Sequence, residues 1–255
     1  MKYRIVIPVV AQSRDFENLL KQIPNKRLLT IVNNFDNDRV AKLCKMAKGQ
    51  GAEVINWPEN RGCAASWNVG LKMIDEHAID FVVILSPSCV WNNDVTEFIE
   101  AVEKMEYEKS RYMYIARGQH QTDTHAFAIT RKCLNEVGTF DENFHPVYFE
   151  DSDYYRRLDL IGAKRTYIDG LRKSTALNGG VKHDLRVWKQ YLESAEALKK
   201  YYKVKWGGGP GRERFPTPYK HAQLTVHDWV DVEYDRQVKL LTKDEFKELQ
   251  DAGLS

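Results

Sequence analysis

The sequence predicts an α/β protein with a mixed, mostly parallel sheet that is flanked by helices. Short apolar runs rich in β-branched residues, such as 3–10 and 81–85, have the composition of strands buried on both faces. The segments between such runs repeat their apolar residues with the period of a helix. Strands that alternate with helices form parallel sheets, because a parallel connection needs a crossover long enough to hold a helix.

The N-terminal half of the chain alternates strand and helix in order. Ser13 or Asp15 can cap the first helix, which Pro24 closes. Asp94 and Glu97 have the spacing of a capping box at the start of a later helix. We expect strands at 3–10, 28–32, 53–57 and 81–85, and helices at 13–23, 40–48, 62–77 and 94–105.

The C-terminal half is less regular. Pro146 disfavours a helix before it, whereas Tyr154, Leu158 and Ile161 recur at helical spacing up to the stop signal at Gly162. We expect strands at 112–116, 125–129 and 164–168, an irregular segment at 173–184, and helices at 131–137, 150–162, 185–202 and 242–253.

Composition excludes several classes of protein. The 255 residues are 43% hydrophobic, which supplies a core, and the net charge of +2 does not demand a nucleic-acid or membrane partner. The four cysteines lack CxxC spacing, so a thiolate metal site is not expected. No apolar leader follows Met1, and no window reaches about 18 apolar residues. We therefore expect a cytoplasmic protein without a membrane span, of undetermined oligomeric state.

We expect an α/β domain at 1–185 and a C-terminal helical extension at 186–255 that packs on it. In this extension, Lys199–Lys220 interleaves basic and aromatic residues around a glycine-rich break at 207–211. A mobile lid or a solvated loop is the first explanation of this composition. Contact with the phosphates and bases of a nucleic acid is the alternative.

The stretch Phe140–Arg157 brings acidic residues to the start of a helix. Aromatic residues lead into Glu150, Asp151 and Asp153, where the helical spacing begins. Acids at a helix N-terminus are favoured by the helix dipole alone. A carboxylate beside aromatic walls also acquires the raised pKa of a catalytic base. By itself, the stretch leaves both explanations open.

Four motifs occur in the order and spacing of a known family. They are Val6-Ile7-Pro8-Val9, Asn60-Arg61-Gly62 through Asn68-Val69-Gly70, Gly138-Thr-Phe-Asp141-Glu142, and Tyr148-Phe-Glu-Asp-Ser-Asp153. Over roughly residues 3–185 the chain resembles the family 2 glycosyltransferases, which have a GT-A fold and are typically inverting. The resemblance implies a GT-A (Rossmann-like) fold and transfer of a sugar from a nucleotide-diphosphate donor to an acceptor hydroxyl.

The resemblance also implies a donor site, formed by Pro8, Val9, Asn33, Asp36, Arg61, Gly62, Asn68, Ser86 and Ser88. Asn33 stands where the family usually has a base-binding Asp, and Asn can still bond a uracil or thymine edge. Ser86-Pro87-Ser88 stands where the family has an acidic metal-binding motif, and serine hydroxyls are poor ligands for Mg or Mn. Such an ion is therefore either lost or held mainly by the donor diphosphate. His183 has the position of a metal- or diphosphate-binding histidine in some relatives, and a structural role is its alternative.

On the acceptor side, Glu150-Asp151 matches the family's acidic motif, whose second member is the usual general base. We expect Asp151 to be the base, Glu150 a substitute base or an acceptor-orienting residue, and Asp153 a helix-cap acid. Tyr148 and Phe149 are expected to contact the acceptor, a glycan, a small molecule or, as an alternative, a modified nucleic-acid base. A rival hypothesis is a non-catalytic nucleotide- or glycan-binding module, which the serines favour and the intact acidic pair disfavours.

Overall fold

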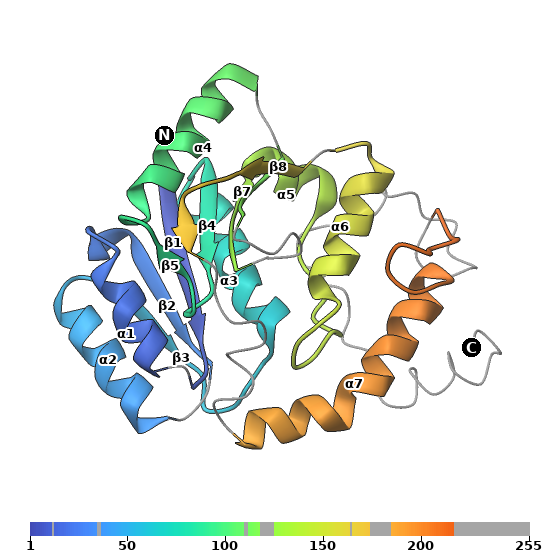
Figure 1. The fold of residues 1–255 in the computed structure, drawn as a ribbon, viewed down its shortest axis with the longest axis horizontal. Coiled ribbons are helices and arrows are strands. Elements are labelled where there is room, and N and C mark those ends of the chain that lie inside the picture. Colours follow the sequence, from blue (N-terminus) through green and yellow to red (C-terminus); the bar gives the residue numbers. More distant parts are fainter. Residues whose placement is uncertain are drawn as a thin grey trace.

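The computed structural model describes residues 1–11, 13–34, 37–109, 112–117, 125–163, 165–173 and 185–216. A seven-stranded sheet lies at the centre, with helices on both faces (Figure 1). This arrangement confirms the predicted mixed, mostly parallel α/β architecture. Within the described ranges, no helix is both long and apolar enough to cross a membrane.

The sheet is built outward from β1 (Tyr3–Val9), which pairs in parallel with a strand on each side. The strand order is β3-β2-β1-β4-β7-β6-β8, and only β7 runs antiparallel to its neighbours. The chain leaves β1 towards β2 and β3 and then returns to the other side as β4. The carboxyl ends of β1 and β4 therefore form a topological switch point, where open α/β sheets bind their ligands. The other strands are β2 (Leu29–Asn33), β3 (Glu53–Asn56), β4 (Phe81–Leu85), β6 (Met113–Ala116), β7 (Ala126–Thr130) and β8 (Arg165–Ile168).

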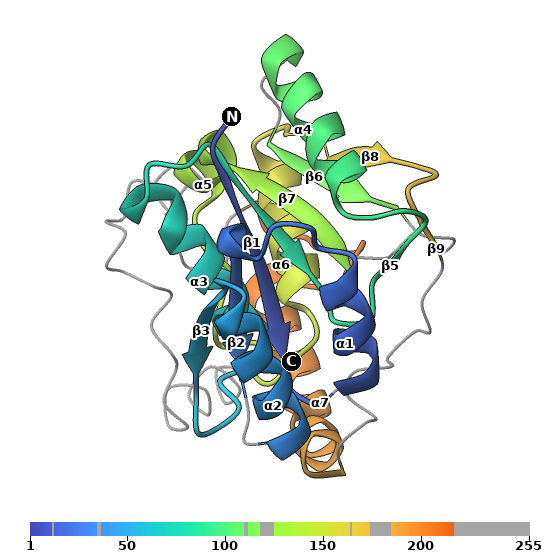
Figure 2. The same ribbon diagram turned by 90° about the vertical axis from the view of Figure 1, so that its left-hand side faces the viewer.

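Each face of the sheet has its own layer of helices. Along β1, Ile5, Ile7 and Val9 enter one core and Val6 enters the other, because successive side chains of a strand point to opposite faces. Figure 2 shows α1 and α4 on one side of the strands and α3 and α5 on the other. The first layer is α1 (Ser13–Lys21), α2 (Asp38–Gly49) and α4 (Thr96–Lys109); the second is α3 (Cys63–Glu76), α5 (Arg131–Val137) and α6 (Glu150–Leu160).

The last described helix, α7 (Leu185–Trp206), lies beside α6 and outside the two layers (Figure 1). Its C-terminal half buries Leu198, Tyr201, Tyr202 and Trp206 against Phe144. The chain then turns back, and the backbone N–H groups of residues 214 and 215 donate to the carbonyl of residue 206. The part of the predicted basic segment up to residue 216 is thus packed structure. The two-domain division stays a prediction, and the helix expected at 242–253 lies outside the described residues.

Two short strands were not predicted from the sequence. β5 (Val90–Trp91) pairs antiparallel with β9 (Arg172–Lys173). A two-residue strand is too short to show a period, and its partner here is distant in the chain. The pair matters for function because β5 begins just after Ser86 and Ser88, at the switch point of the sheet.

Candidate active site

The acidic pair starts α6 after a backbone that is held in an unusual conformation. Tyr148 and Phe149 have φ values of 81° and 74°, in the left-handed region that costs a residue with a side chain about 1–3 kcal/mol. Phe149 is the N-cap and makes no side-chain capping bond. Two adjacent left-handed residues turn the chain sharply, so that Glu150 and Asp151 both fall in the first turn of the helix.

The acidic loop is joined to the turn that precedes α3. The His145 ring Nε2 lies 2.8 Å from the Asn60 carbonyl oxygen, and the Cys63 N–H donates to the Pro146 carbonyl at 2.8 Å. Gly62 lies between these contacts. The predicted donor-side turn and the predicted catalytic loop are therefore one connected unit.

Gly62→Ala is expected to destabilise the fold by about 1–3 kcal/mol, because Gly62 has φ +90° and ψ 170°. A Cβ there would also lie 3.0 Å from His145 Cδ2 and 3.1 Å from the Pro146 carbonyl oxygen. Urea denaturation measures the loss. Gly49→Ala is the matched control: a Cβ at Gly49 meets nothing within 4 Å, so stability should hold or rise. Equal effects of the two substitutions would contradict the assigned strain.

Asn34 organises the same turn, a role the sequence did not single out. Its amide donates to Asn60 Oδ1 at 3.0 Å and to the Gly62 carbonyl at 3.1 Å, and its Oδ1 accepts from the Arg61 N–H at 2.8 Å. The Arg61 guanidinium lies over the Trp57 ring at 5.1 Å. Asn34 thereby links the end of β2 to the start of α3. The run of Asn and Asp at 33–38 was the only signal, and it does not show which member turns inward.

Asn33 ends β2 and donates from Nδ2 to Asn56 Oδ1 at 2.9 Å. Its own Oδ1 is buried and has no hydrogen-bond partner among the described residues. A base-binding role for Asn33 stays a prediction. Asp36 and His183 lie outside the described residues.

Glu150 is a buried carboxyl group with an incomplete set of partners. Its side chain is 4% exposed, and Oε2 has no hydrogen-bond partner among the described residues. Burial and, second to it, the charge of Asp151 raise the pKa of Glu150 to about 8, although hydrogen bonds from backbone N–H groups and from the Cys63 thiol oppose the rise. Glu150 is therefore mostly protonated at pH 7. The Cys63 contact was not predicted, since no spacing rule pairs these positions.

The raised pKa of Glu150 makes a prediction for stability. The unfolded chain loses this proton near the ordinary carboxyl pKa of 4.5, whereas the folded chain keeps it to about pH 8. Between these values the folded state binds more protons, so this group lowers stability as pH rises, by up to about 1.4 kcal/mol per pH unit. Glu150→Gln mimics the neutral form. The free energy of unfolding of the variant, measured by urea denaturation, should therefore rise relative to that of the wild type from pH 5 to pH 8. A difference that does not change with pH would contradict the assignment.

Asp151 is the more exposed acid of the pair and is half-buried. Its Oδ1 accepts from the Ser152 N–H at 2.7 Å and from Ser152 Oγ at 3.3 Å. These two bonds come from the next residue, so they fix the carboxylate relative to its own helix turn. Asp151 is thus oriented and, unlike Glu150, it is accessible to a ligand.

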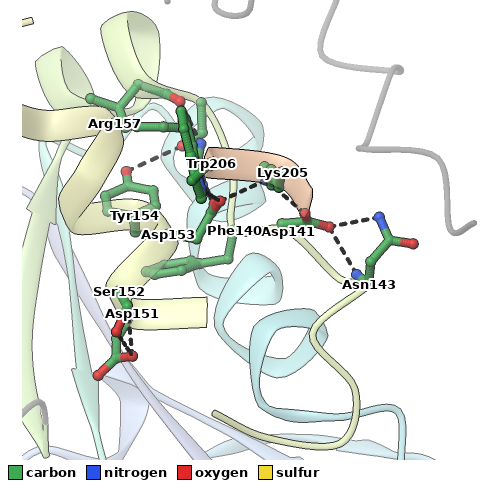
Figure 3. A network of polar contacts seen from close by, with 12 residues as sticks. Phe140, Asp141, Asn143, Asp151, Ser152, Asp153, Tyr154, Arg157, Lys205 and Trp206 are labelled. Carbon is green, nitrogen blue, oxygen red and sulfur yellow. Dashed lines mark hydrogen bonds and ion pairs between the residues drawn. The ribbon is translucent and has the colours of Figure 1, made fainter. Parts of the chain in front are cut away.

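A network of buried charges lies further along α6, between this helix and the end of α7 (Figure 3). Lys205 Nζ lies 2.7 Å from Asp141 Oδ2 and 2.6 Å from Asp153 Oδ1, and all three side chains are 0% exposed. Arg157 Nε donates to Asp153 Oδ2 at 3.1 Å, and Trp206 Nε1 donates to Asp153 Oδ1 at 2.8 Å. Asp151 lies apart from this network in Figure 3.

Two predictions are corrected by this network. Asp153 is not a helix-cap acid, because its carboxylate points into the protein and is held by Lys205 and Arg157. Lys205 belongs to the segment predicted as a lid or solvated loop, yet it is buried and paired with Asp141. It therefore has no place among cations that would contact a nucleic acid.

Three further predicted site residues are held by contacts within the fold, and their roles toward donor or acceptor stay predictions. Asn68 is buried, and its amide bonds both the backbone of Phe140 and Glu142 Oε1, so it supports the loop before α6. Val9 is fully buried in the core, so only its backbone can reach a ligand, whereas Pro8 before it is partly buried. Phe149 packs against an aromatic cluster, with its ring 5.5 Å from that of Tyr202.

Tyr148 keeps a ring next to the acidic pair. It meets Tyr191 of α7 edge to face at 4.7 Å, and Tyr191 lies 5.2 Å from Trp188. All three rings are only partly buried. They form an aromatic surface beside α6, of which the sequence suggested only Tyr148, since α7 is about forty residues further along the chain.

The end of β4 has hydroxyl and imidazole groups where the resemblance implied a metal. Ser86 Oγ lies 2.9 Å from Ser88 Oγ, which lies 3.3 Å from His125 Nδ1. Divalent cations such as Mg and Mn prefer carboxylate oxygens, and this turn supplies none. Within the described ranges, no three His, Cys, Asp or Glu residues come together as a metal site. These residues do not fit the implied ion.

Comparison with known proteins bears on the fold. No protein-family model and no curated protein matches the chain. Among solved structures, S. aureus TarS residues 1–349 in complex with UDP has a TM-score of 0.53 at 13% identity over 80% of this chain and 72% of that one. S. aureus TarS has a TM-score of 0.51 at 14% identity, and the match spans 78% of this chain but only 40% of that one.

The fold is GT-A-like. Identities this low show the fold alone, so the fold class is confirmed and the roles of individual residues stay predictions. Open α/β sheets bind their ligands in the crevice at the carboxyl ends of the strands. Asn33, Arg61, Gly62, Ser86 and Ser88 all lie at the ends of strands or at the turn that follows one, on this edge of the sheet.

Proposed function

We propose that the protein is an inverting glycosyltransferase that moves a sugar from a nucleoside-diphosphate donor to an acceptor hydroxyl, with Asp151 as the general base. One observation carries the proposal: Asp151 is a half-buried, oriented carboxylate whose neighbour Glu150 is buried and holds a proton near neutral pH. The GT-A-like fold and the presence of UDP in the complex of TarS support a nucleotide donor.

Inversion needs one base on the face opposite the leaving group. Asp151 accepts the proton of the acceptor hydroxyl while that oxygen attacks the anomeric carbon and the nucleoside diphosphate departs. Neutral Glu150 places no second negative charge beside the base, so the proposed acceptor of the proton has no like charge next to it. Glu150 then serves as an orienting residue. Tyr148, with Tyr191 behind it, offers a ring face to the acceptor.

The burial of Lys205 favours a glycan or small-molecule acceptor over a modified nucleic-acid base. Lys199, Lys200 and Lys203 remain exposed on α7, but Lys205 is held in an internal ion pair. The following loop is packed as well, with Arg156 donating to the Phe215 carbonyl at 2.9 Å. DNA binding, measured as a function of salt concentration, separates the two acceptor classes. A nucleic-acid acceptor requires binding at low salt that weakens when Lys199, Lys200 and Lys203 are replaced by Ala, whereas a glycan or small-molecule acceptor predicts no such binding.

The test is a donor panel. UDP-, GDP-, CDP- and dTDP-sugars are incubated with simple glycoside acceptors, release of the nucleoside diphosphate is measured, and the anomeric configuration of the product is read by NMR. One donor should give product of inverted configuration. Retention would refute inversion. Binding of nucleotide without release of diphosphate from any donor would favour the rival hypothesis of a non-catalytic binding module.

A further inference from the structure

The turn after β4 presents hydrogen-bonding groups at the switch point of the sheet. Ser86, Ser88 and His125 form a continuous chain of contacts, from hydroxyl to hydroxyl at 2.9 Å and from hydroxyl to imidazole Nδ1 at 3.3 Å. The Ser86 N–H donates to the His125 carbonyl at 2.6 Å, which extends the ladder between β4 and β7 by one residue. The backbone therefore holds the imidazole ring beside both serines.

Hydrogen bonds from Cys89 and Arg172 hold this turn in place. The Cys89 N–H donates to the Ser86 carbonyl at 3.0 Å, and the Cys89 thiol donates to the His125 carbonyl at 2.7 Å. Arg172, on β9, is 5% exposed and donates to the Ala116 carbonyl at 2.9 Å and to Cys89 Sγ at 3.7 Å. The small β5–β9 pair thus braces the turn that carries the two serines.

The chemistry of the cluster suits an anion better than a cation. Hydroxyl and imidazole groups can all donate hydrogen bonds, and bonds to ionised oxygens are the strong ones. Carboxylates at this turn would repel a diphosphate unless a cation lay between them. Serines remove that repulsion, so the reason for a bridging cation disappears.

From this geometry we propose that Ser86, Ser88 and His125 bind the donor diphosphate directly, and that donor binding is independent of divalent metal. The proposal rests on the proposed glycosyltransferase function and adds a role for His125. The imidazole of His125 contacts phosphate oxygens that an ion would otherwise coordinate. The two serine hydroxyls beside it complete a donor set for phosphate oxygens.

The test is binding, measured by calorimetry on the full chain. UDP, GDP, ADP, CDP and dTDP are titrated in EDTA and again with MnCl₂, and the tightest ligand is compared with its nucleoside. Wild-type affinity should agree within about twofold in the two buffers. His125→Ala should weaken the diphosphate by about tenfold or more and leave the nucleoside within about twofold. His77→Ala, at the exposed C-terminal end of α3, is the matched control and should change neither.

The Ser88→Asp variant tests the opposite case, in which a carboxylate at the turn makes diphosphate binding depend on a metal ion. Circular dichroism checks that the variant is folded. Placing a carboxylate at the turn should weaken the diphosphate in EDTA and make MnCl₂ restore it. Loss of wild-type binding in EDTA would overturn the proposal, as would equal weakening of diphosphate and nucleoside by His125→Ala. If none of the five nucleoside diphosphates binds in either buffer, the proposed glycosyltransferase function itself fails, which separates the two failures.

Discussion

Replacing Asp151 with Asn is expected to lower kcat by about 10²–10⁴-fold, the usual contribution of a general base. Asn has the same shape and keeps an Oδ1 acceptor for the Ser152 N–H, which lies 2.7 Å from the present carboxylate oxygen. It cannot accept the proton of the acceptor hydroxyl. Steady-state kinetics with the active nucleotide sugar measure the loss, and donor affinity should stay within about twofold.

Two further variants serve as control and comparison for Asp151→Asn. Asp159→Asn makes the same change in the last turn of the same helix, at an exposed residue paired with Arg165 at 3.5 Å, and should leave kcat unchanged. Glu150→Gln should lower kcat far less than Asp151→Asn, because Glu150 is already neutral near pH 7. An active Asp151→Asn protein with an inactive Glu150→Gln protein would instead assign the base to Glu150.

Replacing Lys205 with Met is expected to lower the free energy of unfolding by about 3–5 kcal/mol, since removing one partner leaves buried charge uncompensated. Lys205 bridges Asp141 and Asp153 at 2.7 and 2.6 Å, and none of the three is exposed. Arg157 still compensates Asp153 in the variant, but Asp141 loses its ammonium partner. Urea denaturation at pH 7 measures the change.

The pH dependence of unfolding is an independent check that Lys205 stabilises the fold through its ion pair with Asp141. Burial alone would raise the pKa of Asp141, but the charge and hydrogen bond of Lys205, together with hydrogen bonds from Tyr201 and the Asn143 N–H, lower it below the ordinary 3.8. The stabilisation is therefore complete above pH 3.8 and is lost as pH falls through the lowered pKa. The difference in free energy of unfolding between the wild type and the Lys205→Met variant should therefore become smaller as the pH falls below 3.8.

The matched control for Lys205→Met is Lys203→Met on the exposed side of the same helix, where the change should stay within about 0.5 kcal/mol. Adding Asp141→Asn to the Lys205→Met variant removes the stranded charge and should recover part of the loss. If Lys203→Met and Lys205→Met destabilise equally, the buried pair is not the cause.

The central strands of the large sheet were predicted from the sequence because burial on both faces demands continuous apolar runs. Phe81–Leu85 is the clearest example, since all five residues are buried and the predicted bounds are those observed. β5 and β9 could not be predicted in the same way. Each has two residues, and their pairing depends on a contact between positions 90 and 173.

The candidate site was predicted in part. The sequence placed Glu150 and Asp151 at a helix start, and the structure puts them in the first turn of α6. It did not show which neighbouring polar residues turn inward: Asn68 and Asp153 are internal supports, and Lys205 is buried despite its basic, glycine-rich surroundings. Helical spacing gives relative positions on a helix, but the face that is buried depends on what packs against it.

The sequence by itself determined the α/β architecture, the position of the acidic pair and the absence of carboxylates at Ser86-Pro87-Ser88, because these depend on local composition and order. Only the tertiary structure decided what surrounds them. Lys205 reaches Asp141 across 64 residues, and Ser88 reaches His125 across 37. The charge state of Glu150 likewise follows from burial and from Asp151, Cys63 and the surrounding fold. Desolvation and pairing are properties of the packed chain, so no local pattern contains them.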